Sequence, residues 1–240
     1  MWLQWVCLLL FIAYFVGFET VWGLTSFRKA LADIIAHRQS RIRLYRQMMA
    51  ELWGPALVVL ALVLFGLFDA GAIGLGWLRP AGQLWVVIVA AVLAGLYFAY
   101  LVYSLVVLIR NAARKQDLGQ KFPAEVEAML PVTRQEKQVW AATAVTAGFA
   151  EELLYRGFLF HLLGVLFPVL PPFAVLGIST VLFGLGHIYQ GLAEAVKPML
   201  LGLLYGFIYL AFGTIWPCVV LHALQDLCAT WVINQTAPQA

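Results

Sequence analysis

Long runs of apolar residues, separated by short polar connections, extend along this chain from end to end. Most of these runs approach the roughly 20 residues that a helix needs to cross the hydrocarbon core of a bilayer. Their spacing predicts an all-α, polytopic transmembrane helix bundle with about seven spans, within a range of six to eight. We place the spans at residues 2–24, 53–77, 83–109, 138–165, 171–190, 198–213 and 215–233.

Composition supports a membrane protein and excludes two other classes. The chain has 240 residues, of which 63% are hydrophobic, whereas soluble domains are about half apolar. Only 15 residues are Lys or Arg and 12 are Asp or Glu, giving a net charge of +3. A soluble globular protein is therefore excluded, and we expect no nucleic-acid partner, because the basic residues lie beside apolar spans rather than on a basic face.

The basic residues indicate how the spans are oriented. They gather in two connections, residues 28–46 and 110–137, and the loop at 69–79 between them is nearly uncharged. Because Lys and Arg collect in cytoplasmic loops, seven spans put the N-terminus outside and the C-terminus inside. The connection 111–136 is either an amphipathic interfacial helix or a solvated linker, and the sequence leaves both open.

The chain divides into three segments of one membrane domain. Residues 1–130 hold the N-terminal spans and the basic connections, residues 131–233 hold the polar residues described next, and residues 234–240 form a polar tail. The chain has no internal repeat and no Gly/Ser linker, so nothing indicates a second domain.

Charged residues are rare in the second half of the chain. From residue 138 onward there are six, of which Glu194 and Lys197 fall in a predicted short loop. The other four lie inside predicted spans: Glu151, Glu152, Arg156 and Asp226. Ionisable groups are costly in hydrocarbon, so they usually face a bundle interior or a water-filled cavity and mark function.

The first polar cluster contains two adjacent acids. Glu152 and Arg156 are four residues apart on a predicted helix, in the acid-first order that favours an ion pair. Glu151 points about 100° away and has no such partner. We therefore expect Glu152 and Arg156 to brace the fold and Glu151 to carry proton chemistry; a purely structural charge network is the alternative.

The second cluster places Phe183 and His187 one helical turn apart. If spans 138–165 and 171–190 form an antiparallel hairpin that turns near Pro168–Pro172, Glu151 and His187 lie about equally far from the turn. The sequence therefore predicts that Glu151 and His187 meet at a similar depth.

The third cluster, His222 and Asp226, again has the spacing of one helical turn. Asp226 can orient His222, or both can face one substrate oxygen or a metal. Counting along the spans places His222 nearer the other end of its helix than His187. The three clusters meet only if the region Gly213–Pro217 breaks or offsets that helix.

Taken in order, the three clusters resemble the signature of the CAAX-protease and bacteriocin-processing family of intramembrane proteases (CPBP, or Abi). That signature is EExxxR, then FxxxH, then HxxxN or HxxxD. The matching residues are Glu151, Glu152, Arg156, Phe183, His187, His222 and Asp226. The resemblance covers about residues 131–233. It departs from the prenyl-protein endopeptidases at Asp226, where those enzymes typically carry Asn.

The resemblance implies an enzyme of the bacterial cytoplasmic membrane. It would be an intramembrane endopeptidase that hydrolyses a peptide bond in a membrane-associated or lipidated protein or peptide. Glu151 and His187 would activate water, and His222 and Asp226 would stabilise the oxyanion or bind metal. Glu152, Arg156 and Phe183 would support the site.

The residues of the three clusters are compatible with a metal-dependent and with a metal-free mechanism. A divalent metal such as Zn²⁺ would take its ligands from Glu151, His187, His222 and Asp226. A metal-free mechanism uses the same residues as base and oxyanion donors. The anionic Asp226 suits a metal better than an oxyanion, which favours the metal-dependent mechanism.

Other functions compete with hydrolysis. The chain has no HExxH, GxSG or GxGD motif, which argues against site-2-type, rhomboid-type and presenilin-type proteases. A non-enzymatic membrane scaffold or a bacteriocin self-immunity protein of the same family is the main alternative. A secondary transporter is the third, since intramembrane acids and histidines also relay protons, but no inverted repeat supports it.

Overall fold

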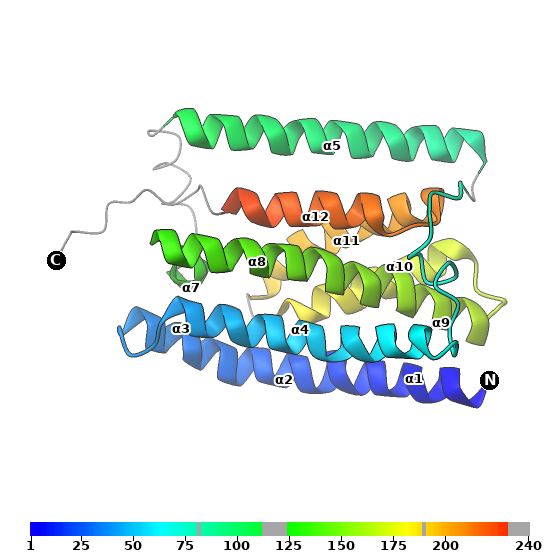
Figure 1. Ribbon diagram of the computed structural model, residues 1–240, viewed down its shortest axis with the longest axis horizontal. Helices are drawn as coiled ribbons and strands as arrows, with labels where there is room; N and C mark the ends of the chain where they lie inside the picture. The colour runs from blue at the N-terminus through cyan, green and yellow to red at the C-terminus, as the bar shows by residue number, and fades with distance from the viewer. Residues whose placement is uncertain (81–82, 112–123, 189–190, 230–240) are drawn as a thin grey trace.

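The described residues of the chain fold into a bundle of helices. A computed structural model describes residues 1–80, 83–111, 124–188 and 191–229. Counting each unbroken helical run once, the described residues contain eight helices and no strand, which confirms the all-α prediction there. The predicted tail, residues 234–240, lies outside the described residues. Figure 1 shows that most of the helix axes follow one common direction.

The first helix is longer than the predicted span 2–24 and runs unbroken from Trp2 to Ile35. Two stretches within it are π-helical, and the turns between them are α-helical. Its parts are α1 (Trp2–Ile12), η1 (Ala13–Glu19), α2 (Thr20–Trp22), η2 (Gly23–Phe27) and α3 (Arg28–Ile35). The basic residues at the start of the first connection are therefore helical.

The prediction of a second span at 53–77 is wrong at both ends. The helix α4 (Arg41–Leu64) begins at Ser40, whose hydroxyl caps it by accepting from the Arg43 amide. It ends before Gly66, whose φ of 70° leaves the helical region. The predicted span begins too late because the first turns of α4 are rich in arginine, which lowers their hydropathy. It ends too late because hydropathy does not identify glycines that end a helix.

The third predicted span is confirmed as α5 (Leu84–Arg110). The following connection is described only from residue 124 on, where α7 (Ala124–Met129) lies against the end of α3. The Arg41 side chain donates to the Ala128 carbonyl over 2.7 Å. Whether the rest of the connection is an interfacial helix lies outside the described residues.

The second half begins with one long helix that changes type within it. It comprises α8 (Arg134–Glu151), η3 (Glu152–Leu159) and α9 (Phe160–Leu166). A five-residue turn leads back into α10 (Pro172–Gly186), and the Ser179 hydroxyl donates to the Tyr155 carbonyl across the pair. The predicted antiparallel hairpin is therefore present.

The last two helices, α11 (Leu192–Phe212) and α12 (Trp216–Ala229), are separated by a break at Gly213. Gly213 has a φ of 64° and lies so close to the Arg79 carbonyl that an added Cβ would stand 2.7 Å from its oxygen. The break that the site requires is therefore present. Glu194 and Lys197 belong to the start of α11 rather than to the predicted loop.

Close backbone packing brings α12 against α8. A Cβ on Gly148 would lie 2.9 Å from the Ala223 amide nitrogen, so only glycine permits this approach. The Trp140 indole donates to the Asp226 carbonyl over 2.9 Å and fixes the other end of the contact. This packing sets His222 beside the two glutamates of the neighbouring helix.

Membrane insertion is indicated by the length and composition of the helices. Within the described ranges, four helices are long and apolar enough to cross a bilayer: Trp2–Ile35, Arg41–Leu64, Leu84–Arg110 and Ala195–Phe212. The apolar α10 has 15 residues and α12 has 14, and both are shorter than a usual span. The described chain is thus an integral, multi-pass membrane protein.

Gly157 is expected to be a packing requirement of η3. A Cβ there would collide with the Ile73 carbonyl oxygen, whereas one on Gly164, in the same long helix, would meet nothing within 4 Å. Gly157→Ala should lower the free energy of unfolding by about 1–3 kcal/mol. Gly164→Ala should leave it unchanged or raise it. Thermal denaturation in detergent tests the pair, and equal melting temperatures would contradict the contact.

Candidate active site

The three polar clusters of the sequence converge on one cavity, which we call the histidine cavity. It encloses about 340 Å³ between α4, α8, α10, α11 and α12. Its lining includes the residues predicted as catalytic: Glu151, His187, His222 and Asp226. The expectation that these four side chains meet is confirmed, and their chemical roles stay predictions.

The buried ion pair of Glu152 and Arg156 lies behind the cavity wall, where it contacts the lining residues Phe183 and His222. Arg156 Nη1 lies 2.9 Å from Glu152 Oε1, and the two side chains are 1% and 0% exposed. The guanidinium also lies over the Phe183 ring, 4.3 Å from its centroid. Charge pairing and cation–π contact together hold a cation in the protein interior.

His222 is held by the same glutamate. Its Nδ1 lies 2.8 Å from Glu152 Oε1, and because a carboxylate accepts, Nδ1 carries the hydrogen. The other nitrogen, Nε2, then lies 3.8 Å from Glu151 Oε2 and 3.7 Å from Asp226 Oδ2. Glu152 therefore braces both Arg156 and His222, a second contact that the sequence did not reveal.

Glu151 is the less tightly paired of the two glutamates, with His222 Nε2 at 3.8 Å from its Oε2, against 2.9 Å between Arg156 Nη1 and Glu152 Oε1. Its Oε2 is buried and accepts no hydrogen bond from any residue that the structure describes. A buried polar atom without a protein partner marks a place for water or substrate. Its position beside His222 Nε2 is compatible with proton transfer, and the role of Glu151 stays a prediction.

His187 ends α10 on the opposite wall. Its Nδ1 lies 2.8 Å from the Phe183 carbonyl oxygen, and since that oxygen only accepts, the ring donates through Nδ1. In the neutral ring Nε2 then carries the lone pair. Phe183 thus orients His187 as well as covering Arg156.

Asp226 is partly exposed, with 27% of its side chain accessible. The neighbouring Gln225 amide oxygen accepts from the hydroxyls of Tyr205 and Tyr97. The Tyr205 ring stacks on His222 with centroids 5.5 Å apart. These contacts fix the end of α12 and were not foreseen from the sequence.

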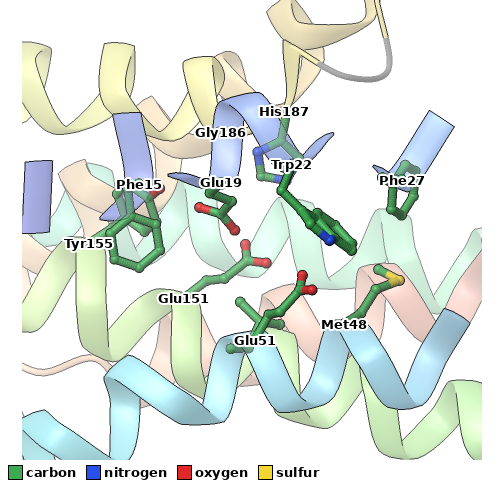
Figure 2. A pocket seen from close by; sticks show the side chains of 11 residues that line it. Phe15, Glu19, Trp22, Phe27, Met48, Glu51, Glu151, Tyr155, Gly186 and His187 are labelled. Atoms are coloured by element: carbon green, nitrogen blue, oxygen red, sulfur yellow. The ribbon is translucent and has the colours of Figure 1, made fainter. Parts of the chain in front are cut away.

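Two further carboxylates, together with Glu151, surround a second, smaller space, which we call the carboxylate chamber. It encloses about 50 Å³ and is lined by Glu19, Glu51 and Glu151 together with His187. In Figure 2 the carboxylates of Glu19, Glu51 and Glu151 point toward one another. The sequence reasoning missed Glu19, although it lies inside predicted span 2–24 and the rule for intramembrane charges applies to it.

Lys197 was also missed, because it was assigned to a loop. It lies in the first turns of α11 and lines the histidine cavity together with Met129 and Leu130. The cavity therefore extends toward the end of the bundle where α7 packs.

A metal ion does not fit the site as it is arranged. Among the described residues, no three His, Cys, Asp or Glu side chains stand in a group that could hold one. Glu152 occupies one nitrogen of His222, and Nε2 of that ring faces two carboxylates rather than sharing a centre with His187. We therefore derive no step through a metal.

Comparison with known proteins agrees with the site. No curated protein and no solved structure matches the chain. Residues 135–228 match a family described as type II CAAX prenyl endopeptidase Rce1-like, and this range contains all three polar clusters. The resemblance drawn from the motifs is confirmed: residues 135–228 of this chain form a domain of the Rce1-like type II CAAX prenyl endopeptidase (CPBP/Abi) family.

Proposed function

We propose that the protein is an intramembrane endopeptidase that hydrolyses a peptide bond with a water activated by Glu151 and His187. One observation carries the proposal: the buried, unpartnered Oε2 of Glu151 lies within 3.8 Å of His222 Nε2 and lines one cavity with His187. Family membership of residues 135–228 supports peptidase chemistry.

The proposed reaction uses each side chain once. Glu151 takes a proton from water while the water oxygen bonds to the carbonyl carbon, and His187 orients that water through Nε2. His222, held through Nδ1 by Glu152, acts as the doubly protonated imidazolium and donates from Nε2–H to the developing oxyanion. The carbon–nitrogen bond then breaks, and the proton on Glu151 passes to the leaving nitrogen.

The substrate we propose is a membrane-associated or lipidated protein or peptide. The family name supports a lipid-modified substrate. An apolar cavity of about 670 Å³ opens between the first helix and α4, and its wall includes Leu154 and Phe158. Those two residues follow Glu151 on the same helix, so an apolar chain there would lie near the reacting bond.

The orientation we propose has the N-terminus outside, the C-terminus inside and seven spans. The basic first connection and the described end of the third lie together, since Arg41 donates to the Ala128 carbonyl. Lys197 and Met129 line the histidine cavity at that end. By the positive-inside rule the cavity would then face the cytoplasm.

The metal-dependent version stays a separate prediction. It would require Glu151, His187, His222 and Asp226 to move together around a divalent ion such as Zn²⁺. Elemental analysis of chelator-treated, active protein tests it. Full hydrolysis by protein without bound metal would eliminate the metal-dependent version. Activity that returns only when metal is added would eliminate the metal-free version.

Asp226→Asn is expected to separate the two versions by its effect on kcat. In the metal-free reaction the amide has the same shape and donates to an oxyanion, so kcat should stay within about tenfold of wild type. In Asp226→Ala the side chain can neither donate nor accept a hydrogen bond, so kcat should fall further than in Asp226→Asn. A loss of more than about a hundredfold in Asp226→Asn would indicate a ligand carboxylate instead.

The rival function is that of a non-enzymatic scaffold or self-immunity protein. It is favoured by the fully buried Glu152–Arg156 pair, which would also hold helices together without catalysis. Purified wild type, Glu151→Ala and His187→Ala should be compared on lipidated peptides and membrane proteins. We expect cleavage by wild type alone; equal activity in all three, or none in wild type, would defeat the hydrolase proposal.

A further inference from the structure

The carboxylate chamber and the histidine cavity share part of their walls. Both are lined by Glu151 and His187, and also by Met48 and Leu52. The two proposed water-activating residues therefore lie between two spaces of different size. Only the larger space, of about 340 Å³, can accept a peptide segment.

The size of the carboxylate chamber restricts what it can hold. The space open to the centre of a water molecule is about 50 Å³, and about 10–15 Å³ of such space is enough for one water. A few waters therefore fit, and a peptide segment does not. The chemical class of its occupant is thus water.

The polar lining of the chamber comes from four different helices. Glu19 ends η1, Glu51 belongs to α4, Glu151 ends α8, and His187 follows α10. Figure 2 shows the carboxylate of Glu19 directed at that of Glu151. Glu151 Oε2 is the buried oxygen that accepts no hydrogen bond from any described residue.

Holding these acids together is unfavourable for folding. No Lys or Arg side chain lies among the described residues that line the chamber. Carboxylates gathered without a cation repel one another and lose hydration. Such a cost is typical of a site retained for function rather than for stability.

Local backbone features bring Glu19 to this position. A Cβ on Gly186 would stand 3.2 Å from the Tyr155 hydroxyl, which is tight, and 3.8 Å from Glu19 Oε2, which is an ordinary contact, so the end of α10 passes close to both groups. Glu19 ends a π-helical stretch, and such stretches are frequent at functional sites. The first helix is thereby fitted to the hairpin that carries Glu151 and His187.

We propose that the carboxylate chamber holds the hydrolytic water before attack and that Glu19 is a positioning residue for it. In the chamber Glu19 accepts one hydrogen bond of the water and Glu151 accepts the other; at attack His187 Nε2 replaces Glu19 as the acceptor. Glu151 then takes its proton, the oxygen bonds to the carbonyl carbon, and the leaving nitrogen receives that proton. This inference rests on the proposed hydrolase function.

The test compares Glu19→Leu, Glu19→Gln and wild type on a peptide that wild type cleaves. Leucine removes both acceptors, so kcat should fall about 10- to 100-fold with KM within about twofold. Glutamine keeps one acceptor oxygen and should retain more activity than leucine. The melting temperature of Glu19→Leu should equal or exceed that of wild type, because a buried acid is removed.

A matched control is Gln4→Leu, which makes the same kind of change on the same helix away from the chamber. It should leave kcat unchanged. The positioning role would be overturned if Glu19→Leu had the kcat of wild type. It would also be overturned if Glu19→Leu and Glu19→Gln lost the same kcat and the loss followed a lowered melting temperature. If Glu151→Gln is inactive while Glu19→Leu is fully active, only this inference fails; if both are fully active, the hydrolase proposal fails too.

Discussion

Glu151→Gln is expected to lower kcat for peptide hydrolysis by about 100- to 10,000-fold, the range that general acid–base catalysis contributes. The amide has the same shape but cannot take a proton from water. Because Glu151 Oε2 makes no hydrogen bond to a described residue, the fold should not depend on its charge. Steady-state kinetics of purified protein measures the effect.

The melting temperature separates lost chemistry from lost structure. It should be unchanged or higher in Glu151→Gln, since the neutral amide is less costly to bury than a carboxylate. Glu127→Gln, a change of an exposed carboxylate on α7, is the matched control and should keep full activity. A Glu151→Gln variant that retains more than about a tenth of wild-type kcat would exclude Glu151 as the base.

Arg156→Met should destabilise the protein by about 3–5 kcal/mol, because it leaves Glu152 buried without its cation. Glu152 and Arg156 are 0% and 1% exposed, so water cannot replace the lost partner. His222 should lose its orientation with Glu152, so activity falls even in the protein that remains folded. Thermal denaturation in detergent and kinetics at low temperature test both effects.

Two further variants show whether the ion pair is responsible. Glu152→Gln combined with Arg156→Met removes both charges and should recover much of the lost stability. Arg38→Met breaks the pair with Asp33, where the arginine is 69% exposed, and should cost less than about 1 kcal/mol. If the double variant is no more stable than Arg156→Met, the buried charge is not the cause.

Much of the fold could be predicted because apolar length and helix-breaking residues are local properties. The hairpin followed from two apolar runs around Pro168–Pro172, and α5 matched its predicted bounds closely. The span at 53–77 failed because a hydropathy window counts apolar residues and does not register that Gly66 adopts a positive φ. A hydropathy window also misses helix starts that are rich in arginine, as in α4.

The candidate site could be predicted within one half of the chain and not across the two halves. Glu151, His187 and His222 stood out as polar groups in apolar helices, and fixed spacing tied Glu152 to Arg156. Contacts between distant helices depend on packing, such as the approach of α12 to Gly148. For that reason the bond from His222 to Glu152 had no local signal.

Glu19 shows a different limit. It is the single acid of the predicted span 2–24, and intramembrane ionisable residues are functional candidates wherever they occur. The ionisable residues of the second half form motifs with fixed spacing, whereas Glu19 has no such neighbour in the sequence. The structure brings Glu19 to the same chamber as Glu151 and His187.

Cleavage in water enriched in ¹⁸O provides the most direct measurement. Purified wild type in lipid vesicles is mixed with a lipidated, membrane-anchored peptide, and the products are weighed by mass spectrometry. A peptide bond cut by an activated water should leave one ¹⁸O atom in the new carboxylate of the N-terminal fragment in wild type, and no fragment in Glu151→Gln or His187→Ala. No labelled fragment from wild type, or the same labelled fragment from all three proteins, would contradict hydrolysis by this site.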